Sequence, residues 1–181
     1  MDPSEPMRNA TGVSLARLEH ELRRADRFDE ASWREGLEAD VIAAKLESAG
    51  LDVSPDVIDL YSWHDGAMYD PNIPPAKREL PRGWTMLRLD SALEHRQMLL
   101  NGAAEIPDEP EFDDMRFFPF FLPWATAGGS GGWLVIDCRP RQFTDVTVLN
   151  YHTDGTEWVA ASLAACIKDL IRALEGEDDW S

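Results

Sequence analysis

Three segments between Arg116 and His152 constrain the fold of this chain most, because they are rich in aromatic and β-branched residues: RFFPFFLPW, WLVIDC and VTVLNYH. Such residues favour strands, and turns separate the segments. Only a short connection joins Cys138 to Val146, so the second and third segments are predicted to be antiparallel neighbours. Pro119 has no backbone N–H, and we expect it to force its strand to an edge or a bulge. The sequence therefore predicts a mainly antiparallel sheet.

Helical periodicity dominates the amino-terminal part and the end of the chain. Ser14 is predicted to cap a first helix, and a second helix is predicted over 31–49, ended by Gly50 in the left-handed conformation. The second helix should turn four apolar side chains inward: Trp33, Leu37, Val41 and Leu46. Ser162 is predicted to cap a closing helix, SLAACIKDLIRAL, with apolar residues at every third or fourth position. These helices are expected to pack on the sheet, which makes the predicted fold α+β.

The middle of the chain is predicted to hold a short helix, a proline-rich loop, a strand and another helix. The first of these helices is capped by Ser54 and ended by a turn at Asp65-Gly66. Its inward face is expected to carry Val57, Leu60, Tyr61 and His64. The loop AMYDPNIPPAKRELPRG contains too many prolines for a helix. WTMLRLD is predicted to be a strand, and Ser91 with Glu94 forms the capping box of a helix that ends at Asn101-Gly102.

Length and charge restrict the organisation and the partners. The 181 residues suit one domain, which we place at 14–174 between a flexible amino terminus, 1–13, and an acidic tail, 175–181. The chain carries 34 acidic against 17 basic residues, a net charge of −17. Such a surface repels nucleic acids and anionic membranes, so neither is expected as a direct partner. Without a signal-peptide pattern or a long apolar run, the chain is expected in the cytoplasm.

The segment GGSGGWLVIDC raises the question of catalysis. Gly128, Ser130 and Gly132 match the G-x-S-x-G pattern of a nucleophile elbow, and Asp137 and His152 follow in the order that this class uses. An elbow and a phosphate-binding loop both lead into a helix, whereas this segment leads into a predicted strand. The glycines are therefore interpreted as a bend that returns the chain to its sheet, and no catalytic residue is predicted.

Neither cysteines nor histidines indicate a metal or a cofactor. Cys138 and Cys166 are expected to be buried, reduced thiols, because two cysteines provide no metal-ligand pattern. His64 with Asp65, and His152 with Asp154, could be argued into a metal site, but nothing in the sequence fixes their geometry. The prediction is no metal and no cofactor.

The order of these segments resembles the SUKH superfamily over Leu51–Leu174. The marks are a helix closing in Asp65-Gly66, a strand that bears phenylalanine and proline, a glycine-rich turn into a strand ending at Asp137, and a final helix after Ser162. The resemblance implies an α+β fold with a mainly antiparallel sheet. It also implies a role without catalysis. Most bacterial members are similar to immunity proteins that neutralise a cognate polymorphic toxin, often a nuclease, while the eukaryotic members, cell-wall synthesis regulators of the Smi/Knr type, act as scaffolds.

These observations lead to a binding protein whose negative surface meets a basic partner, expected to be a toxin domain. Aromatic residues dominate interface energetics, and those around the proline-rich loop are Trp63, Tyr69 and Trp84. The acidic candidates lie in one predicted loop: Asp108, Glu109, Glu111, Asp113 and Asp114. For each aromatic the alternative is core packing, and for each acid it is simple solvation. The alternative function is a scaffold or regulator with no toxin partner.

Overall fold

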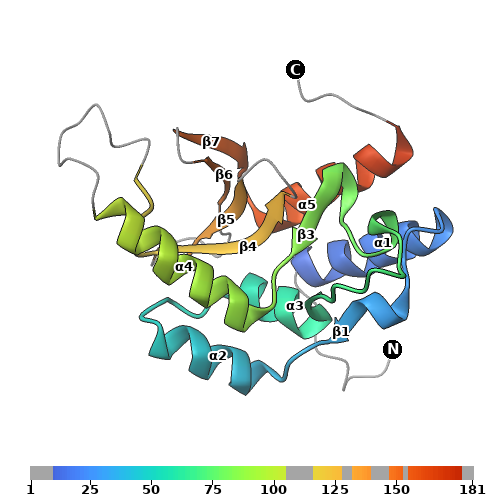
Figure 1. Cartoon of the computed structure of the whole chain (residues 1–181). Helices are drawn as coiled ribbons and strands as arrows, with labels where there is room; N and C mark the ends of the chain where they lie inside the picture. Colours follow the sequence, from blue (N-terminus) through green and yellow to red (C-terminus); the bar gives the residue numbers. More distant parts are fainter. Residues whose placement is uncertain (1–9, 105–115, 128–131, 140–146, 153–154, 177–181) are drawn as a thin grey trace.

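The structure is a computed structural model of the whole chain, and it describes residues 10–104, 116–127, 132–139, 147–152 and 155–176 (Figure 1). The α-helices of this part are α1 (Ala10–Arg24), α2 (Ala39–Ser48), α3 (Pro55–Trp63), α4 (Leu89–Ala103) and α5 (Leu163–Glu175). The strands are β1 (Trp33–Glu35), β2 (His64–Ala67), β3 (Trp84–Met86), β4 (Phe121–Ala127), β5 (Trp133–Asp137), β6 (Val148–His152) and β7 (Gly155–Ala160). The same ranges contain the short 3-10 helices η1 (Glu30–Ser32), η2 (Pro75–Lys77) and η3 (Pro81–Gly83).

The strands form two antiparallel sheets. The large sheet has the order β3-β4-β5-β6-β7, and β1 pairs with β2 in the small one. The predicted α+β fold with a mainly antiparallel sheet is therefore confirmed, as is the pairing of β5 with β6. Strand β7, which pairs with β6 along its whole length, was not predicted.

Helices cover both faces of the large sheet. On the face seen in Figure 1, α4 lies across β4, and Leu99 of this helix joins Phe121 and Val135 in a buried cluster. On the opposite face, Ile167 of α5 and Ile136 of β5 belong to the main core. Helix α1 packs between α5 and α3. It therefore separates α3 from the helix α5, which lies on the sheet. Two apolar clusters thus flank one sheet.

Proline disturbs the sheet at a different place from the one predicted. Pro119 lies before β4, and its carbonyl oxygen accepts hydrogen bonds from the Arg96 guanidinium. Strand β4 begins only at Phe121 and is an inner strand, so the expectation that Pro119 forces its strand to an edge or a bulge was wrong. The register shift falls instead between Pro123 and Ala125, because Pro123 cannot donate to the ladder.

The amino-terminal helices differ from the prediction in their limits. Helix α1 begins at Ala10 rather than at Ser14, whose Oγ donates to the Ala10 carbonyl oxygen 2.8 Å away within the helix. The helix predicted over 31–49 was wrong in its first half, since η1 and β1 precede α2. The chain is extended there because Trp33 pairs with Ala67 of β2.

Close backbone packing explains why no helix forms over β1. A Cβ at Gly36 would lie 1.9 Å from the carbonyl oxygen of Ser62, so α3 passes directly against this part of the chain. Val41, which was expected to face inward, is 40 % exposed on α2. Gly50 does adopt the left-handed conformation after α2, with φ +71°, as predicted.

The segment after α3 is a strand, not a turn. Ser54 caps α3 as predicted, accepting a hydrogen bond from the backbone N–H of Asp56. His64 begins β2 instead of lying on the helix, and Asp65 continues the same strand. The expected turn at Asp65-Gly66 was therefore wrong.

Asp65 instead caps the next helix from a distance in sequence. Its Oδ1 accepts a hydrogen bond from the backbone N–H of Leu89, the first residue of α4, at 2.8 Å. The capping box predicted at Ser91 and Glu94 was wrong, because α4 already starts two residues before Ser91. The helix also continues through Gly102 to Ala103. A tertiary contact, not a local motif, thus sets the start of α4.

The closing helix agrees with its prediction. Ser162 caps α5 by accepting a hydrogen bond from the Ala165 backbone N–H, and Gly176 ends the helix with φ +81°. The apolar stripe of α5 is buried: Leu163, Cys166, Ile167, Leu170 and Ile171. This helix carries the most regular apolar pattern in the chain, and its pattern was sufficient to locate it.

Candidate functional site

The three aromatic residues predicted for partner binding lie in different environments. Trp63 ends α3, half-buried, and Trp84 begins β3, where it packs against the main core. Tyr69 is 81 % exposed, with the Arg78 guanidinium 4.5 Å from its ring centroid. No ring contact joins these three side chains within the described ranges, so they do not form one aromatic cluster.

The other predicted site residues fall outside the described part of the chain. These are the acidic candidates Asp108, Glu109, Glu111, Asp113 and Asp114. Gly128 and Ser130 of the glycine motif lie outside it as well.

The glycine motif leads into a strand, as predicted. Gly132 directly precedes β5, and its carbonyl oxygen accepts a hydrogen bond from the Ala127 backbone N–H at the end of β4. A nucleophile elbow would need a helix at this point. Asp137, the second residue of the suspected triad, is buried and bound through both carboxylate oxygens by Arg139, at 3.0 and 2.6 Å. The chain around β5 therefore lacks the strand-to-helix geometry of an elbow.

The cysteines are free and buried, as expected. Burial raises the pKa of Cys138 to about 12, with a further contribution from the neighbouring Asp137 charge. Burial likewise raises the pKa of Cys166 to about 12. Thiols protonated this firmly are poor nucleophiles and poor metal ligands. In the described ranges, no three His, Cys, Asp or Glu side chains come together in a way that could hold a metal ion.

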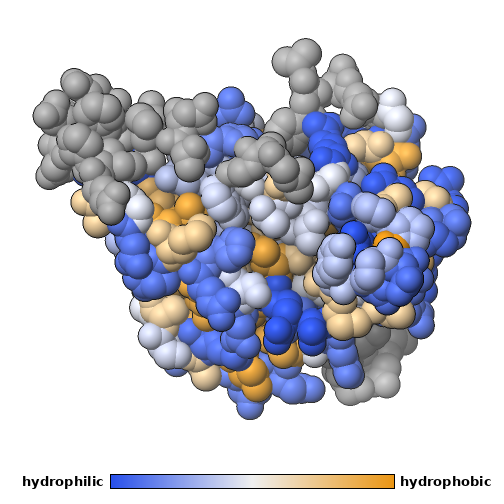
Figure 2. Space-filling view, viewed as in Figure 1, coloured by the Kyte–Doolittle hydropathy of each residue, from blue (hydrophilic) through white to orange (hydrophobic). Residues whose placement is uncertain are grey.

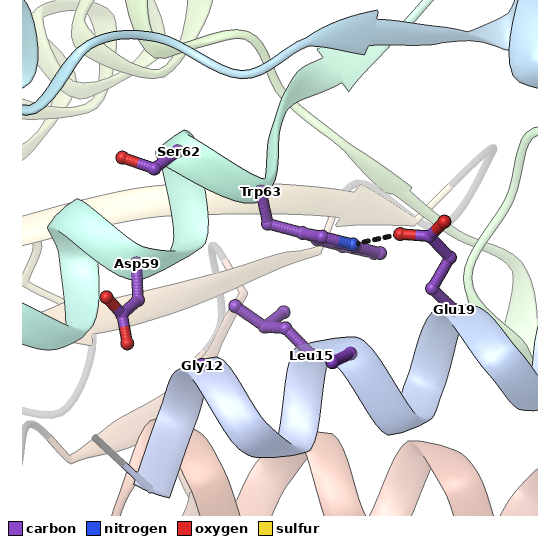
Figure 3. A pocket seen from close by; sticks show the side chains of 7 residues that line it. Gly12, Leu15, Glu19, Asp59, Ser62 and Trp63 are labelled. Atoms are coloured by element: carbon purple, nitrogen blue, oxygen red, sulfur yellow. Dashed lines mark hydrogen bonds between the residues drawn. The ribbon is translucent and has the colours of Figure 1, made fainter. Parts of the chain in front are cut away.

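A surface hollow of about 330 Å³ lies between α1 and α3 (Figure 3). Its lining comes from both helices: Gly12, Leu15, Ala16, Glu19, Asp59, Ser62 and Trp63. Gly12 and Ala16 are small and one helical turn apart, so they leave space where larger side chains would fill the groove between the helices. In Figure 3, Trp63 lies over this space, with Asp59 and Glu19 on opposite sides.

Glu19 is held by charge-assisted hydrogen bonds. Its Oε2 accepts from the Trp63 Nε1–H at 2.7 Å, and its Oε1 accepts from the Arg23 Nη2 and Nε at 2.8 and 3.1 Å. Burial by itself would raise the pKa of Glu19, but the hydrogen bonds and the Arg23 charge outweigh burial, so the pKa lies below its ordinary value. The carboxylate is therefore negative and fixed in position at neutral pH.

Packing against other aromatic rings holds the Trp63 ring in place. The His64 ring lies edge-on to Trp63 with centroids 4.6 Å apart, and the Trp33 ring is tilted at 5.5 Å. Phe28 in turn stacks on Trp33 at 5.7 Å with an interplanar angle of 8°. The His64 Nδ1 lies 2.9 Å from the Arg34 carbonyl oxygen, which anchors that ring to β1. The indole is thus a rigid wall of the hollow.

This arrangement suits a cation, because the ionisable residues in the described lining, Glu19 and Asp59, are acidic and Trp63 adds an indole ring. Trp63 was selected from the sequence, but Glu19 and Asp59 were missed. Asp59 and Trp63 lie four residues apart on α3, a spacing that places them on one helix face and could have indicated a shared site.

A further residue missed from the sequence is Trp158. It lies on β7, the outer strand of the large sheet, and is 66 % exposed opposite Leu149 of β6. It was missed because β7 itself was not predicted.

The fold and this hollow define an α+β protein with a small anionic surface site. Comparison of the chain with protein-family models gives no match, and comparison with the curated proteins gives none either. None of the helices in the described ranges has both the length and the apolar character that crossing a membrane requires.

Proposed function

We propose that this chain is a non-enzymatic binding protein of the SUKH type that acts in the cytoplasm as an immunity protein. Its partner is a basic protein, a toxin domain that it neutralises by binding. Nuclease toxins fit this role best, since a protein that grips phosphates carries a cationic surface. Three features support this role: the charge of the chain, the exposed acids of the α2 region and the order of the elements.

The exposed acidic surface around α2 is the observation that carries the proposal. Five acidic side chains of this region are exposed: Glu35, Glu38, Asp40, Glu47 and Asp52. None of the five forms an ion pair with a described residue, whereas the one lysine of α2, Lys45, is bound to Asp90 of α4. The face of the molecule in Figure 2 is mostly hydrophilic. With a net charge of −17, this surface attracts positive partners and repels nucleic acids.

The order of the elements supports the SUKH resemblance. A helix begins at Pro55, a strand ends at Asp137 after the glycine-rich segment, and a final helix begins after Ser162. The mark at Asp65-Gly66 differs in form, since these residues belong to a strand that leads toward α4. An antiparallel sheet covered by helices offers broad surfaces without requiring a catalytic centre.

The test is the association of the chain with the toxin encoded beside its gene. Stopped-flow mixing over a series of salt concentrations should show the association rate falling at least tenfold from about 20 to about 500 mM NaCl, since salt screens opposite charges. A rate that ignores salt would remove the electrostatic basis of the proposal. Co-expression should rescue cells from that toxin, and failure to rescue from any adjacent toxin would remove the immunity role.

The second candidate is a scaffold or regulator with no toxin partner. The same exposed acidic residues would then hold a basic protein or peptide of the cell itself. Growth of a strain that lacks the gene separates the two. The immunity role predicts death only when the toxin is present, and the scaffold role predicts a defect without it.

A further inference from the structure

We propose that the hollow between α1 and α3 binds a guanidinium group, namely the side chain of an arginine presented by the basic partner. The proposal rests on the proposed function and deepens it, because it names the site and the chemical group that anchors the partner.

The size of the hollow fits a single side chain. Its volume of about 330 Å³ lies at the small end of ligand sites, which span roughly 300–1,000 Å³. Gly12 and Ala16 of α1 line it, and Leu15 adds an apolar surface on the same helix. Figure 3 shows Gly12 and Leu15 on α1, below the Trp63 ring. The methylene stem of an arginine can pack on this apolar surface while its charged end reaches the acids.

The charge of the lining selects a cation. Among the described residues that line the hollow, the ionisable ones are Glu19 and Asp59, and both are acidic. Arg23 does not line the hollow, and it shares its charge between Glu19 and Glu30, at 2.8 and 3.0 Å. The ionisable side chains of the described lining are thus carboxylates alone, which favours a positive ligand.

The indole ring selects a planar cation. Trp63 is fixed by its hydrogen bond to Glu19 and by the rings of His64 and Trp33, so it loses little freedom when a ligand stacks on it. In Figure 3, the indole lies over the side of the hollow formed by Leu15. A guanidinium stacks on such a ring and donates N–H groups in its plane to carboxylates, whereas a compact ammonium cannot do both as well.

A bare metal ion is a poorer occupant of this site. A hard divalent cation needs about six oxygen ligands, and the lining has only two carboxylates on opposite sides of the hollow among the described residues.

The first experiment uses N-acetyl-arginine amide as the probe and N-acetyl-citrulline amide as its neutral isostere. The indole N–H resonance of Trp63 is assigned by its loss in Trp63→Phe and followed by NMR during titration. We expect saturable shifts with the arginine probe and none with the citrulline probe. Equal shifts with both, or a linear response to the arginine probe, would overturn the proposal.

Two variants locate the binding, with one matched control. Glu19→Gln should weaken the arginine probe at least fivefold, and Glu47→Gln removes an equal charge from exposed α2 and should leave its affinity unchanged. Ala16→Leu fills the hollow from an exposed helical position without altering charge, and it should abolish saturable binding. This variant keeps the test valid if Glu19→Gln does not fold. Equal weakening by Glu19→Gln and Glu47→Gln would mean diffuse attraction only, and would overturn the site.

The partner itself separates this proposal from the proposed function. If Ala16→Leu binds the toxin as tightly as the wild type, the arginine anchor is wrong and the immunity role stands. If the wild type binds the arginine probe but no adjacent toxin, the immunity role is wrong, and so is the source of the arginine.

Discussion

At the scale of single residues, Gly66 connects the small sheet to α4. Its φ is +79°, and a Cβ built on it would lie 2.4 Å from the backbone nitrogen of Arg88, just before α4. Glycine is required here for two reasons, the left-handed backbone and the close approach of another backbone segment. Gly50 has a similar φ of +71° but nothing within 4 Å of the same position, so it isolates the first reason.

Replacing these two glycines by alanine should therefore have unequal effects. Gly50→Ala should cost about 1–2 kcal/mol, which is the strain of a left-handed alanine. Gly66→Ala should cost about 1–3 kcal/mol more, because its methyl group overlaps backbone that cannot move freely. Urea unfolding of both variants gives the comparison. Equal destabilisation would contradict the close contact with Arg88.

The two thiols should be inert in the folded protein. With pKa values of about 12, Cys138 and Cys166 carry little thiolate at neutral pH, and both are buried. Alkylation by iodoacetamide at about pH 8 should be on the order of 10³-fold slower than for an exposed cysteine. Mass spectrometry should show both sites modified once urea unfolds the chain. Rapid modification of either residue without urea would contradict its burial.

At the scale of elements, the start of α4 depends on a residue 24 positions away in sequence. Asp65 is only 7 % exposed, and its second oxygen lies 3.6 Å from the Arg88 Nε. It thereby joins β2, the first turn of α4 and a basic side chain. Ser91, the residue with the local capping pattern, lies inside the helix.

Alanine substitutions distinguish the two capping models. Asp65→Ala should destabilise the fold by about 1–2 kcal/mol, because it removes a cap and leaves the Leu89 N–H without its acceptor. Ser91→Ala should change stability by less than about 0.5 kcal/mol, since alanine is a good helix former. Thermal unfolding monitored by circular dichroism measures both. A larger loss for Ser91→Ala would restore the local capping box.

Elements that local chemistry determines were predictable from the sequence, and those that tertiary contacts determine were not. Helix α5 was located by its apolar repeat and its Ser162 cap. The segment around Trp33 has helical spacing too, yet it is extended because β2 pairs with it and α3 passes against Gly36. Tertiary pairing overrides weak helical propensity there.

The candidate site was predictable only in part, for the same reason. Trp63 was selected because exposed aromatic residues anchor partners, and it does line the hollow. Glu19 lies 44 residues earlier, and only the packing of α1 beside α3 brings its carboxylate to the indole. A hollow is a property of two packed surfaces, so neither helix reveals it by itself.

At the scale of the whole molecule, like charges oppose the compact state. The chain has a net charge of −17 on 181 residues, and ion pairs cannot cancel this excess of carboxylates. Most of the ion pairs that the structure describes are exposed and contribute little to stability. Apolar packing on both faces of the sheet must therefore offset this repulsion.

Salt should accordingly stabilise the protein. Raising NaCl from about 20 to about 200 mM shortens the screening length from about 20 to about 7 Å and reduces the repulsion between carboxylates. We expect the unfolding temperature to rise by at least about 3 °C, equivalent to roughly 1 kcal/mol for a chain of this size. Differential scanning calorimetry provides the measurement. A midpoint that stays constant or falls would contradict a fold limited by its own charge.

The exposed Trp158 gives the protein an optical reporter on the sheet edge. The fluorescence of the Trp158 indole comes from a water-exposed ring, whereas that of Trp124 on β4, which is 1 % exposed, comes from a ring in the core. Acrylamide should therefore quench Trp158 more strongly than Trp124 in the free protein. Trp63 lines the hollow and Trp158 does not, so a loss of quenching on binding that persists in Trp63→Phe and disappears in Trp158→Phe would mean that the partner extends across the β7 edge as well.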